Sequence, residues 1–299
     1  MKYILDFDYK NIDNGIEYLK NNEIDYYPDN NERIIYHVYW YGVLRRKQIL
    51  CIKSYLATQD LNNTELWVWL DNDFLETMGD EEGNECDKIN KSISKYENIK
   101  IKTYNSLEES KGTLLENFVK TTKNKNLKFK SDIARVLFLH NYGGIYYDLD
   151  MILLKDLKPL LGIEFCYSWS NRHFGNNGIL RIKKGSDFSK QLIQKYSNVV
   201  KNKNFVIWYN SFIFTEELDI MCLPCVMFDP VWILLDTRQK SKYSKLSDFD
   251  SFFKGTDENI DNFFGNEIFA YHWHSRLHTN IEKDSYFERL EKMIMRKIN

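Results

Sequence analysis

The sequence predicts an α/β protein built on a parallel sheet, and two stretches carry this prediction. Residues 33–72 read as a strand, a helix and a second strand, which is the pattern of a parallel crossover unit. Residues 131–154 read as a helix, a two-glycine turn and an apolar strand. A chain of 299 residues, 43% of them hydrophobic, is long enough for one domain with a sizeable core.

The composition argues against several classes of protein. An aromatic content of 15% excludes a disordered chain. A net charge of −2 without a basic stripe provides no positive electrostatic potential that would attract nucleic acid. The start, MKYILDFDYKN, has too short an apolar run for a signal peptide, and no run of about 18 apolar residues predicts a membrane span. Five cysteines, an odd number, favour a reducing compartment. We therefore expect a soluble, cytoplasmic protein.

Two short motifs suggest other chemistry, and we interpret both as incidental. Cys222 and Cys225 have the spacing of a redox pair or half a zinc site, but no second pair or clustered histidines accompany them. Residues 1–32 are polar and read as an N-terminal appendage. Within it, Ile4–Asp8 resembles the start of haloacid-dehalogenase-type phosphatases, which need Thr or Val where this chain has Lys10.

The first crossover unit accounts for residues 33–72. Residues 33–42, RIIYHVYWYG, are the first expected core strand, and residues 65–72, ELWVWLDN, are the second. Between them, residues 44–59 form an amphipathic helix, because Leu44, Ile49, Ile52 and Leu56 recur at helical spacing. A crossover of this length between parallel strands is right-handed by default.

Residues 73–130 are charged and irregular, with helical patterning around residues 107–119, and we interpret them as a helical excursion. The lysine-rich end, residues 120–130, lacks interleaved aromatic residues. A solvated loop is therefore favoured there over a nucleic-acid patch.

The chain returns to the core at Ser131. Ser131 or Asp132 is the expected cap of a helix, and Gly143 and Gly144 supply the turn that ends it. Residues 145–154 are then nearly all apolar or aromatic, as expected of a buried strand.

Two carboxylates interrupt this apolar strand. Asp148 and Asp150 are two residues apart, so on a continuous strand their side chains point to the same side. Two buried, unpaired carboxylates at one spot are unfavourable, and a divalent cation with oxygen ligands resolves the conflict. On the preceding helix, Asp132 and Arg135 are three residues apart and share a face.

The remaining chain predicts shorter elements. We expect strands at 164–170 and 178–182, a helix at 187–200, a late strand within 221–233 and a C-terminal helix within 281–299.

Read together, the central pieces are S-D-x-x-R followed by G-G-I-Y-Y-D-x-D. With this pattern the sequence resembles the DXD-containing, sugar-nucleotide-dependent glycosyltransferases, namely glycosyltransferase family 32 and, more distantly, the glucosylating clostridial toxins. The resemblance covers roughly residues 33–280. It implies the GT-A fold, a single Rossmann-like mixed sheet sandwiched by helices, with residues 33–280 as the catalytic domain.

The resemblance also implies roles for the motif residues. A cation, Mn²⁺ or Mg²⁺, is expected on Asp150 with Asp148 close by, bridging the diphosphate of the donor. Asp132 is expected to accept hydrogen bonds from sugar hydroxyls, and Arg135 to bind the sugar or a phosphate. Tyr147 is expected at the donor with them.

Three further residues match the family outside the central motif. Trp40 lies in an aromatic-Trp-x-Gly segment that holds the nucleotide base in the family, with core packing as the alternative. Asn177 ends a segment that lies beside the sugar, with an ordinary loop asparagine as the alternative. His272 matches a late histidine that completes the metal shell in the family. The family often has His-x-Trp-Asn, whereas here Trp273 follows His272 directly, and a surface histidine is the alternative. The Phe-Asp-Pro at residues 228–230 matches a structural aromatic-x-Pro segment.

The function that the resemblance implies is metal-dependent hexose transfer with retention of anomeric configuration, as in family 32. The expected donor is a nucleotide-sugar, a UDP-sugar favoured over a GDP-sugar, and the expected acceptor is a glycan, a protein-linked sugar or another hydroxyl. A catalytically degenerate nucleotide-sugar- or glycan-binding protein on the same fold is the alternative, but the four motif residues, Asp132, Arg135, Asp148 and Asp150, are all intact. A nucleotidyltransferase would need a glycine-rich phosphate loop near the start of the chain, which the sequence lacks.

Overall fold

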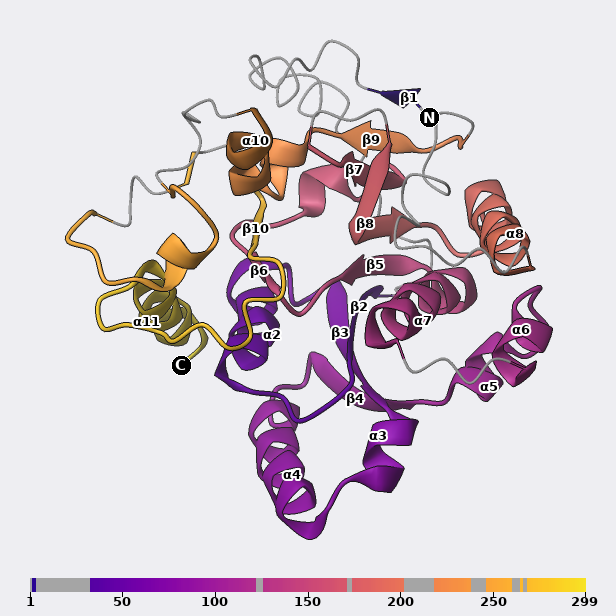
Figure 1. Cartoon of the computed structure of the whole chain (residues 1–299), viewed down its shortest axis with the longest axis horizontal. Coiled ribbons are helices and arrows are strands. Elements are labelled where there is room, and N and C mark those ends of the chain that lie inside the picture. Colours follow the sequence, from indigo (N-terminus) through magenta and orange to yellow (C-terminus); the bar gives the residue numbers. More distant parts are fainter. Residues whose placement is uncertain are drawn as a thin grey trace.

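The computed structural model describes residues 2–3, 33–121, 126–170, 174–201, 218–237, 246–259, 264–265 and 268–299. Within these ranges, a mixed sheet of eight strands forms the middle layer and helices cover both of its faces (Figure 1). The predicted α/β fold, a mixed sheet sandwiched by helices, is confirmed. In sheet order, the strands are β1 (Lys2–Tyr3), β9 (Met221–Leu223), β7 (Phe165–Ser168), β8 (Gly175–Ile182), β5 (Gly144–Tyr147), β2 (Ile34–Trp40), β3 (Thr64–Asp71) and β4 (Ile99–Tyr104).

The strand directions bring the carboxyl ends of several strands to one edge of the sheet. β5, β2, β3 and β4 are parallel to their neighbours in that order, as the predicted crossover unit requires. β8 runs antiparallel to both β5 and β7, so β7 and its parallel neighbour β9 point the same way as β5. The carboxyl ends of β2, β3, β5, β7 and β9 therefore share one edge, where ligands bind in sheets of this kind.

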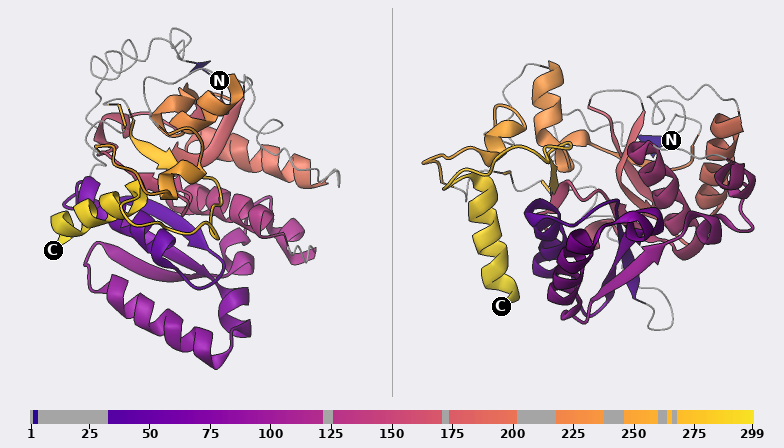
Figure 2. Two further views of the ribbon diagram at one scale, coloured as in Figure 1. Left: turned by 60° about the vertical axis from the view of Figure 1, so that its left-hand side comes forward. Right: turned by 60° about the horizontal axis from the view of Figure 1, so that its bottom comes forward.

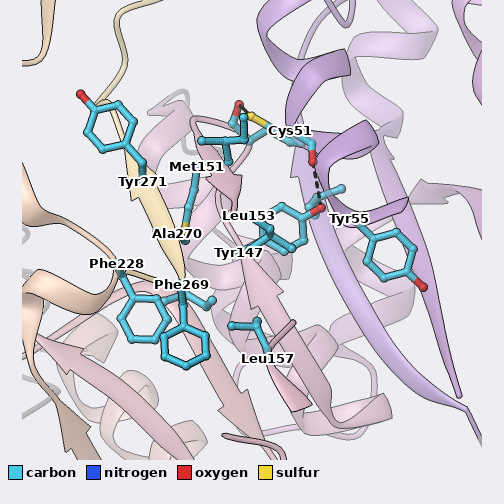
Figure 3. Close-up of a cluster of buried hydrophobic side chains, with 14 of the residues drawn as sticks. Cys51, Tyr55, Tyr147, Met151, Leu153, Leu157, Phe228, Phe269, Ala270 and Tyr271 are labelled. Carbon is cyan, nitrogen blue, oxygen red and sulfur yellow. Dashed lines mark hydrogen bonds between the residues drawn. The ribbon is translucent and has the colours of Figure 1, made fainter. Parts of the chain in front are cut away.

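Two hydrophobic layers join the sheet to its helices, because alternate residues of a strand point to opposite faces. Tyr36 and Val38 of β2 belong to the first cluster, part of which is drawn in Figure 3, and Tyr39 of the same strand belongs to the second. The helices are α2 (Arg46–Thr58), α3 (Asn72–Thr77), α4 (Asp80–Ser94), α5 (Ser106–Ser110), α6 (Glu116–Thr121), α7 (Leu127–Tyr142), α8 (Asp187–Lys201), α10 (Pro230–Thr237) and α11 (Tyr286–Ile298), with 3₁₀ turns at Lys158–Leu160, Cys225–Met227 and Asp250–Phe253. Residues of α2 and α11 contribute to the first cluster, and residues of α7 and α8 contribute to the second.

The stretch 73–130 differs from the helical excursion that the sequence suggests. It contains α3 to α6 and the start of α7, but it also contains β4, which pairs with β3 along its whole length. Alternating lysines in Ile99–Tyr104, IKIKTY, keep this edge strand polar on one side, so its apolar signal is weak. The helix expected from Ser131 also begins earlier. Asn126 caps α7, accepting hydrogen bonds from the backbone N–H groups of Lys128 and Phe129 at 3.0 and 3.3 Å.

The glycine pair ends α7 as expected. Gly143 and Gly144 have φ angles of 68° and 105°, a region that disfavours residues with a Cβ. A Cβ on Gly143 would lie 2.5 Å from the backbone nitrogen of Lys184, and one on Gly144 would collide with the carbonyl oxygen of Ile35. The pair therefore lets β5 start directly against its neighbours in the sheet.

The prediction of one continuous strand at 145–154 is wrong, because the structure has two strands separated by a turn. β5 ends at Tyr147, Asp148 to Asp150 form a turn, and the chain resumes as β6 (Met151–Leu153). The N–H of Met151 donates to the carbonyl of Asp148 at 3.0 Å, which closes the turn. Because β6 pairs with the distant β10 (Ala270–His272) in a separate two-stranded sheet, the backbone has to leave the main sheet at the two aspartates.

This second sheet brings the C-terminal segment to the motif. In its antiparallel register His272 lies opposite Met151, the residue that follows Asp150. α11 then packs along α2 (Figure 2), and its Phe287 is fully buried in the first hydrophobic cluster. Residues more than a hundred positions apart thus meet beside the sheet edge.

Some expectations lie outside the described residues. These are most of the appendage at 1–32, including Ile4–Asp8, and residues 171–173 of the segment before Asn177. Cys222 and Cys225 are described, and the side chains of both are buried. Over the described part of the chain, the helices are all too short or too polar to span a bilayer.

Candidate active site

The guanidinium of Arg135 organises the acidic residues at the sheet edge. Its Nη2 lies 3.0 Å from Asp148 Oδ1 and 3.4 Å from Asp132 Oδ1, and its Nη1 donates to the carbonyl of Asn177 at 2.6 Å. Arg135 is only 5% exposed, so these charges meet in a poorly solvated setting. Asp132 and Arg135 share one helix face, as their spacing predicts, and Arg135 extends from this face to Asp148.

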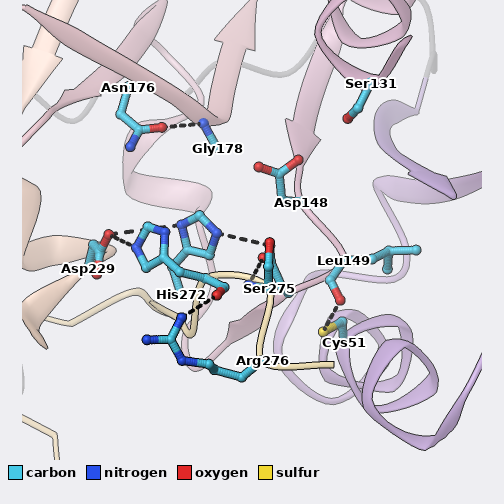
Figure 4. A network of polar contacts seen from close by, with 12 residues as sticks. Cys51, Ser131, Asp148, Leu149, Asn176, Gly178, Asp229, His272, Ser275 and Arg276 are labelled. Atoms are coloured by element: carbon cyan, nitrogen blue, oxygen red, sulfur yellow. Dashed lines mark hydrogen bonds and ion pairs between the residues drawn. The ribbon is translucent and has the colours of Figure 1, made fainter. Parts of the chain in front are cut away.

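Asn177 joins this group from β8 rather than from a loop. Its Nδ2 donates to Asp132 Oδ1 at 2.9 Å and lies 3.4 Å from the hydroxyl of Tyr196. The side chain of the preceding Asn176 turns back and accepts from the N–H of Gly178 at 2.8 Å (Figure 4). The strand that pairs with β5 therefore supplies an amide directly beside the predicted sugar-binding carboxylate.

Asp150 is held by the C-terminal segment. His272 Nε2 lies 2.9 Å from Asp150 Oδ1, and the N–H of Ser275 donates to Asp150 Oδ2 at 2.6 Å. The N–H of Trp273 donates to the main-chain carbonyl of Asp150 at 3.0 Å. The sequence-predicted residues Asp150 and His272 are thus in direct contact, across 122 residues of chain.

The buried charges shift the pKa values of these groups in opposite directions. Burial raises the pKa of Asp148 above its usual value, although Arg135 opposes the shift. Burial alone would also raise the pKa of Asp150, but His272 and the N–H of Ser275 hold it well below its usual range. Burial would lower the pKa of His272, but the carboxylates around it, Asp150 first, raise this pKa to about 9. The cluster therefore favours ionised Asp150.

The donor atoms of Asp148, Asp150 and His272 fit a divalent cation. One ligand atom from each lies within 4.8 Å of the others. Two carboxylates and an imidazole suit Mn²⁺, and carboxylate oxygens suit Mg²⁺. A cation held by Asp150 and His272 would replace the direct contact that these two side chains make with each other.

Two further residues belong to this region, and the sequence did not assign them a role. Asp229 lies just before α10 and is 1% exposed, and its Oδ2 accepts a hydrogen bond from His274 Nε2 at 2.5 Å. The rings of His274 and His272 stack with their centroids 3.8 Å apart. The spacing of two between the histidines was a usable signal, whereas Asp229 was hidden in an aromatic-x-Pro segment with a structural interpretation.

Tyr147 does not join the site. Its side chain is fully buried between the sheet and α2, with its hydroxyl 3.4 Å from the carbonyl of Cys51 (Figure 3). The neighbouring Tyr146 points to the opposite face and donates to Asp148 Oδ1 at 2.9 Å. Because β5 alternates between its two faces, Tyr146 is the tyrosine of this motif that contacts the acidic cluster.

Trp40 ends β2 at the same sheet edge as the acidic cluster. Its indole is half-buried against the first hydrophobic cluster, and its Nε1 donates to the carbonyl of Val43 at 3.2 Å. The position at a strand's carboxyl end agrees with what a base platform requires. The indole also packs against the first hydrophobic cluster, as the core alternative requires.

These features define a candidate ligand site whose donor atoms fit a divalent cation, and the comparison with protein families gives the class of the protein. The model of a glycosyltransferase sugar-binding region containing a DXD motif matches residues 47–166. This interval includes Asp132, Arg135, Asp148 and Asp150. The chain therefore carries a DXD-type glycosyltransferase region, which confirms the enzyme class predicted from the sequence. A search of curated proteins found no match.

Several solved structures are similar to this chain at low sequence identity. The PaToxG glycosyltransferase is 16% identical, over 70% of this chain and 77% of its own, with a TM-score of 0.47. An active-site mutant of LgtC is 12% identical, over 87% of this chain and 96% of its own, with a TM-score of 0.46. GlyE of Streptococcus pneumoniae TIGR4 is 14% identical, over 89% of this chain and 60% of its own, with a TM-score of 0.48. The class of the protein rests on the family match.

Proposed function

We propose that this glycosyltransferase is metal-dependent and retaining, and that it moves a hexose from a UDP-sugar to a hydroxyl of a glycan or a protein-linked sugar. The observation that carries the proposal is the convergence of Asp148, Asp150 and His272 beside the Asp132–Arg135 pair. The catalytic unit we propose spans residues 33–280. α11 packs in the same core, so we expect it to fold with this unit.

The proposed cation is Mn²⁺ or Mg²⁺, held by Asp148, Asp150 and His272. When bound, it would neutralise the charge that develops on the departing nucleoside diphosphate. The N–H of Ser275 supports this proposal, because it orients the carboxylate of Asp150 before any ligand arrives, and the N–H of Trp273 holds the main chain of the same residue.

On the donor sugar, we propose Asp132 and Asn177 as hydrogen-bonding partners of hydroxyls. The Nδ2 of Asn177 already donates to Asp132 Oδ1, and Arg135 holds the same carboxylate. Asp132 can accept from a sugar hydroxyl, because an ionised carboxylate has about four acceptor positions. Arg135 is buried and paired, so we assign it to holding the two carboxylates rather than to a phosphate.

For the reaction itself, we propose attack by the acceptor hydroxyl on the face from which the diphosphate departs. The bond between the anomeric carbon and the phosphate oxygen breaks, the new bond forms to the acceptor oxygen, and the acceptor proton passes to the phosphate. Each carboxylate of the site is held by a cationic or N–H group: Asp132 and Asp148 by Arg135, Asp150 by His272 and Asp229 by His274. This argues against a free carboxylate nucleophile.

A donor panel tests the proposal. The protein is incubated with UDP- and GDP-sugars and Mn²⁺, and release of the nucleoside diphosphate is measured with and without candidate acceptors. Release from a UDP-sugar, with retained anomeric configuration in the product, is the expected result. Tight nucleotide binding without release from any donor would instead support the binding-only alternative.

Trp40 is proposed as the platform for the base. Stacking of a base on an aromatic ring contributes about 1–3 kcal/mol, so Trp40→Ala should weaken UDP binding roughly 5- to 150-fold at about 1.4 kcal/mol per decade. Trp40→Phe should recover most of the loss. The measurement is the UDP dissociation constant together with the melting temperature.

The core alternative gives a different result for the same variant. Truncating a core tryptophan costs about 3–5 kcal/mol of stability. A large fall in melting temperature, with an unchanged dissociation constant in the remaining folded protein, would remove Trp40 from the site.

Asp132→Asn should lower turnover more than it weakens UDP binding, because Asp132 is assigned to the sugar. Losing a hydrogen bond to a charged group costs about 1.5–3 kcal/mol, or roughly 10- to 150-fold in rate. Asp73→Asn is the matched control, since Asp73 follows β3 near the same edge and its side chain is 64% exposed. Equal losses of turnover and UDP affinity in Asp132→Asn would place Asp132 at the nucleotide instead.

A further inference from the structure

The segment 272–280, which we call the C-terminal strap, reaches Asp150 in an unfavourable backbone conformation. His274 and Ser275 have φ angles of 50° and 58°, although both have a Cβ. This conformation directs the N–H of Ser275 to Asp150 Oδ2, while His272 Nε2 reaches the other carboxylate oxygen. Such a conformation persists where surrounding contacts hold it. The groups that hold this strap therefore determine the geometry around Asp150.

Asp229 is the buried carboxylate behind the two histidines of the strap. Its Oδ2 lies 2.5 Å from His274 Nε2 and 3.9 Å from His272 Nδ1. Its Oδ1 is buried and has no hydrogen-bond partner in the described part of the chain. A carboxylate that is 1% exposed is unfavourable unless nearby donors or cations stabilise it. The two imidazoles are the groups that can do so.

The orientation of His272 gives Asp229 a possible role in metal binding. A histidine that binds a metal through one ring nitrogen almost always donates the N–H of the other to a carboxylate, carbonyl or water. With Nε2 directed at Asp150, Nδ1 of His272 faces the hydroxyl of Tyr167 at 3.2 Å and Asp229 at 3.9 Å. Gly178 leaves room for this ring, because a Cβ there would lie 3.2 Å from His272 Cε1.

We propose that Asp229 is a positioning residue for the metal-binding pair Asp150 and His272. It anchors His274, which sets the N–H of Ser275 on Asp150, and it faces the ring nitrogen of His272 that points away from Asp150. This inference rests on the proposed metal dependence. It adds a residue that contacts neither the cation nor the donor.

The same three side chains could hold a cation themselves, because Asp229, His272 and His274 each offer an atom within 4.8 Å of the others. The packing of His274 favours positioning instead. Its ring packs against both Trp232 and Phe249, with centroid distances of 4.4 and 4.7 Å, and its Nε2 already contacts Asp229 directly. An imidazole packed in this way has little freedom to admit an ion between itself and the carboxylate.

The test is direct Mn²⁺ binding to the full chain with UDP present, measured as free Mn²⁺ by electron paramagnetic resonance. Loss of an outer partner of a metal-binding histidine typically weakens metal binding about 10- to 100-fold, and we expect this for Asp229→Asn. Asp187→Asn is the matched control, because Asp187 lies at the start of α8 with 90% of its side chain exposed. We expect Asp187→Asn to bind Mn²⁺ like the wild type.

The outcomes separate this inference from the proposed function. Wild-type protein that binds no Mn²⁺ contradicts the metal proposal itself. If the wild type binds Mn²⁺ and Asp229→Asn binds it equally well, the role of Asp229 is overturned. If the wild type binds two Mn²⁺ ions and Asp229→Asn loses one of them, the role is also overturned, because Asp229 would then be a metal ligand itself. If Asp229→Asn does not fold, His274→Gln tests the same link, because it removes the ring that Asp229 anchors. Unchanged Mn²⁺ affinity in folded His274→Gln also overturns the inference.

Discussion

Asp150→Ala should abolish sugar transfer while the protein stays folded. Asp150 is the carboxylate that His272 and Ser275 orient, and its side chain is 15% exposed rather than part of the hydrophobic core. A metal ion contributes several kcal/mol of transition-state stabilisation, so the loss of rate should exceed about 100-fold at ~1.4 kcal/mol per decade. Nucleotide release from the donor sugar measures it, and chelation of the wild type should give the same loss.

Asp187→Ala is the matched control for this variant. Its carboxylate lies at the start of α8 with 90% of the side chain exposed, so turnover and melting temperature should equal those of the wild type. Near-normal turnover in chelated protein, or in Asp150→Ala, would show that the metal assignment is wrong. Loss of turnover accompanied by unfolding would instead assign Asp150 to stability.

Local sequence patterns predicted the elements that carry the site. The strand–helix–strand at 33–72 and the helix that ends at Gly143 depend on contacts between residues close in sequence, so their periodicity is readable. The S-D-x-x-R spacing placed Asp132 and Arg135 on one helix face, and in the structure Arg135 contacts both Asp132 and Asp148. The side chains that meet at this edge were therefore found from local spacing, while their roles in the reaction stay predictions.

Features that depend on distant pairing were not predictable in the same way. The turn at 148–150 exists because β6 pairs with β10, which lies more than a hundred residues later. Asp229 contacts His274 only because α10 and the C-terminal strap meet in space. Tyr147 differs from these two features, because strand alternation already places Tyr146, two residues before Asp148, on the side of that carboxylate. The expectation that Tyr147 lies at the donor therefore failed for a local reason: β5 turns this side chain into the core.

The largest expected effect on stability comes from Arg135→Met. Arg135 is the shared cation of Asp132 and Asp148, and its removal leaves two largely buried carboxylates without their charge partner. Burial raises the pKa of both carboxyls and Arg135 opposes this shift, so we expect their ionised forms to depend on Arg135. Breaking a buried ion pair from one side typically costs 3–5 kcal/mol, so we expect the free energy of unfolding to fall by about this amount. Urea denaturation at neutral pH measures it.

Two variants make this last measurement specific. Arg45→Met makes the same change in an exposed ion pair with Glu85, where the two side chains are 63% and 41% exposed. Exposed pairs contribute about 0–1 kcal/mol, so this control should lose little stability. Arg135→Lys keeps the charge but loses the planar fork that spans both carboxylates and the carbonyl of Asn177, so its loss should fall between the two. If Arg135→Met lost no more stability than Arg45→Met, Arg135 would not be what holds the two carboxylates together, and its assignment would move from the acidic cluster to the ligand.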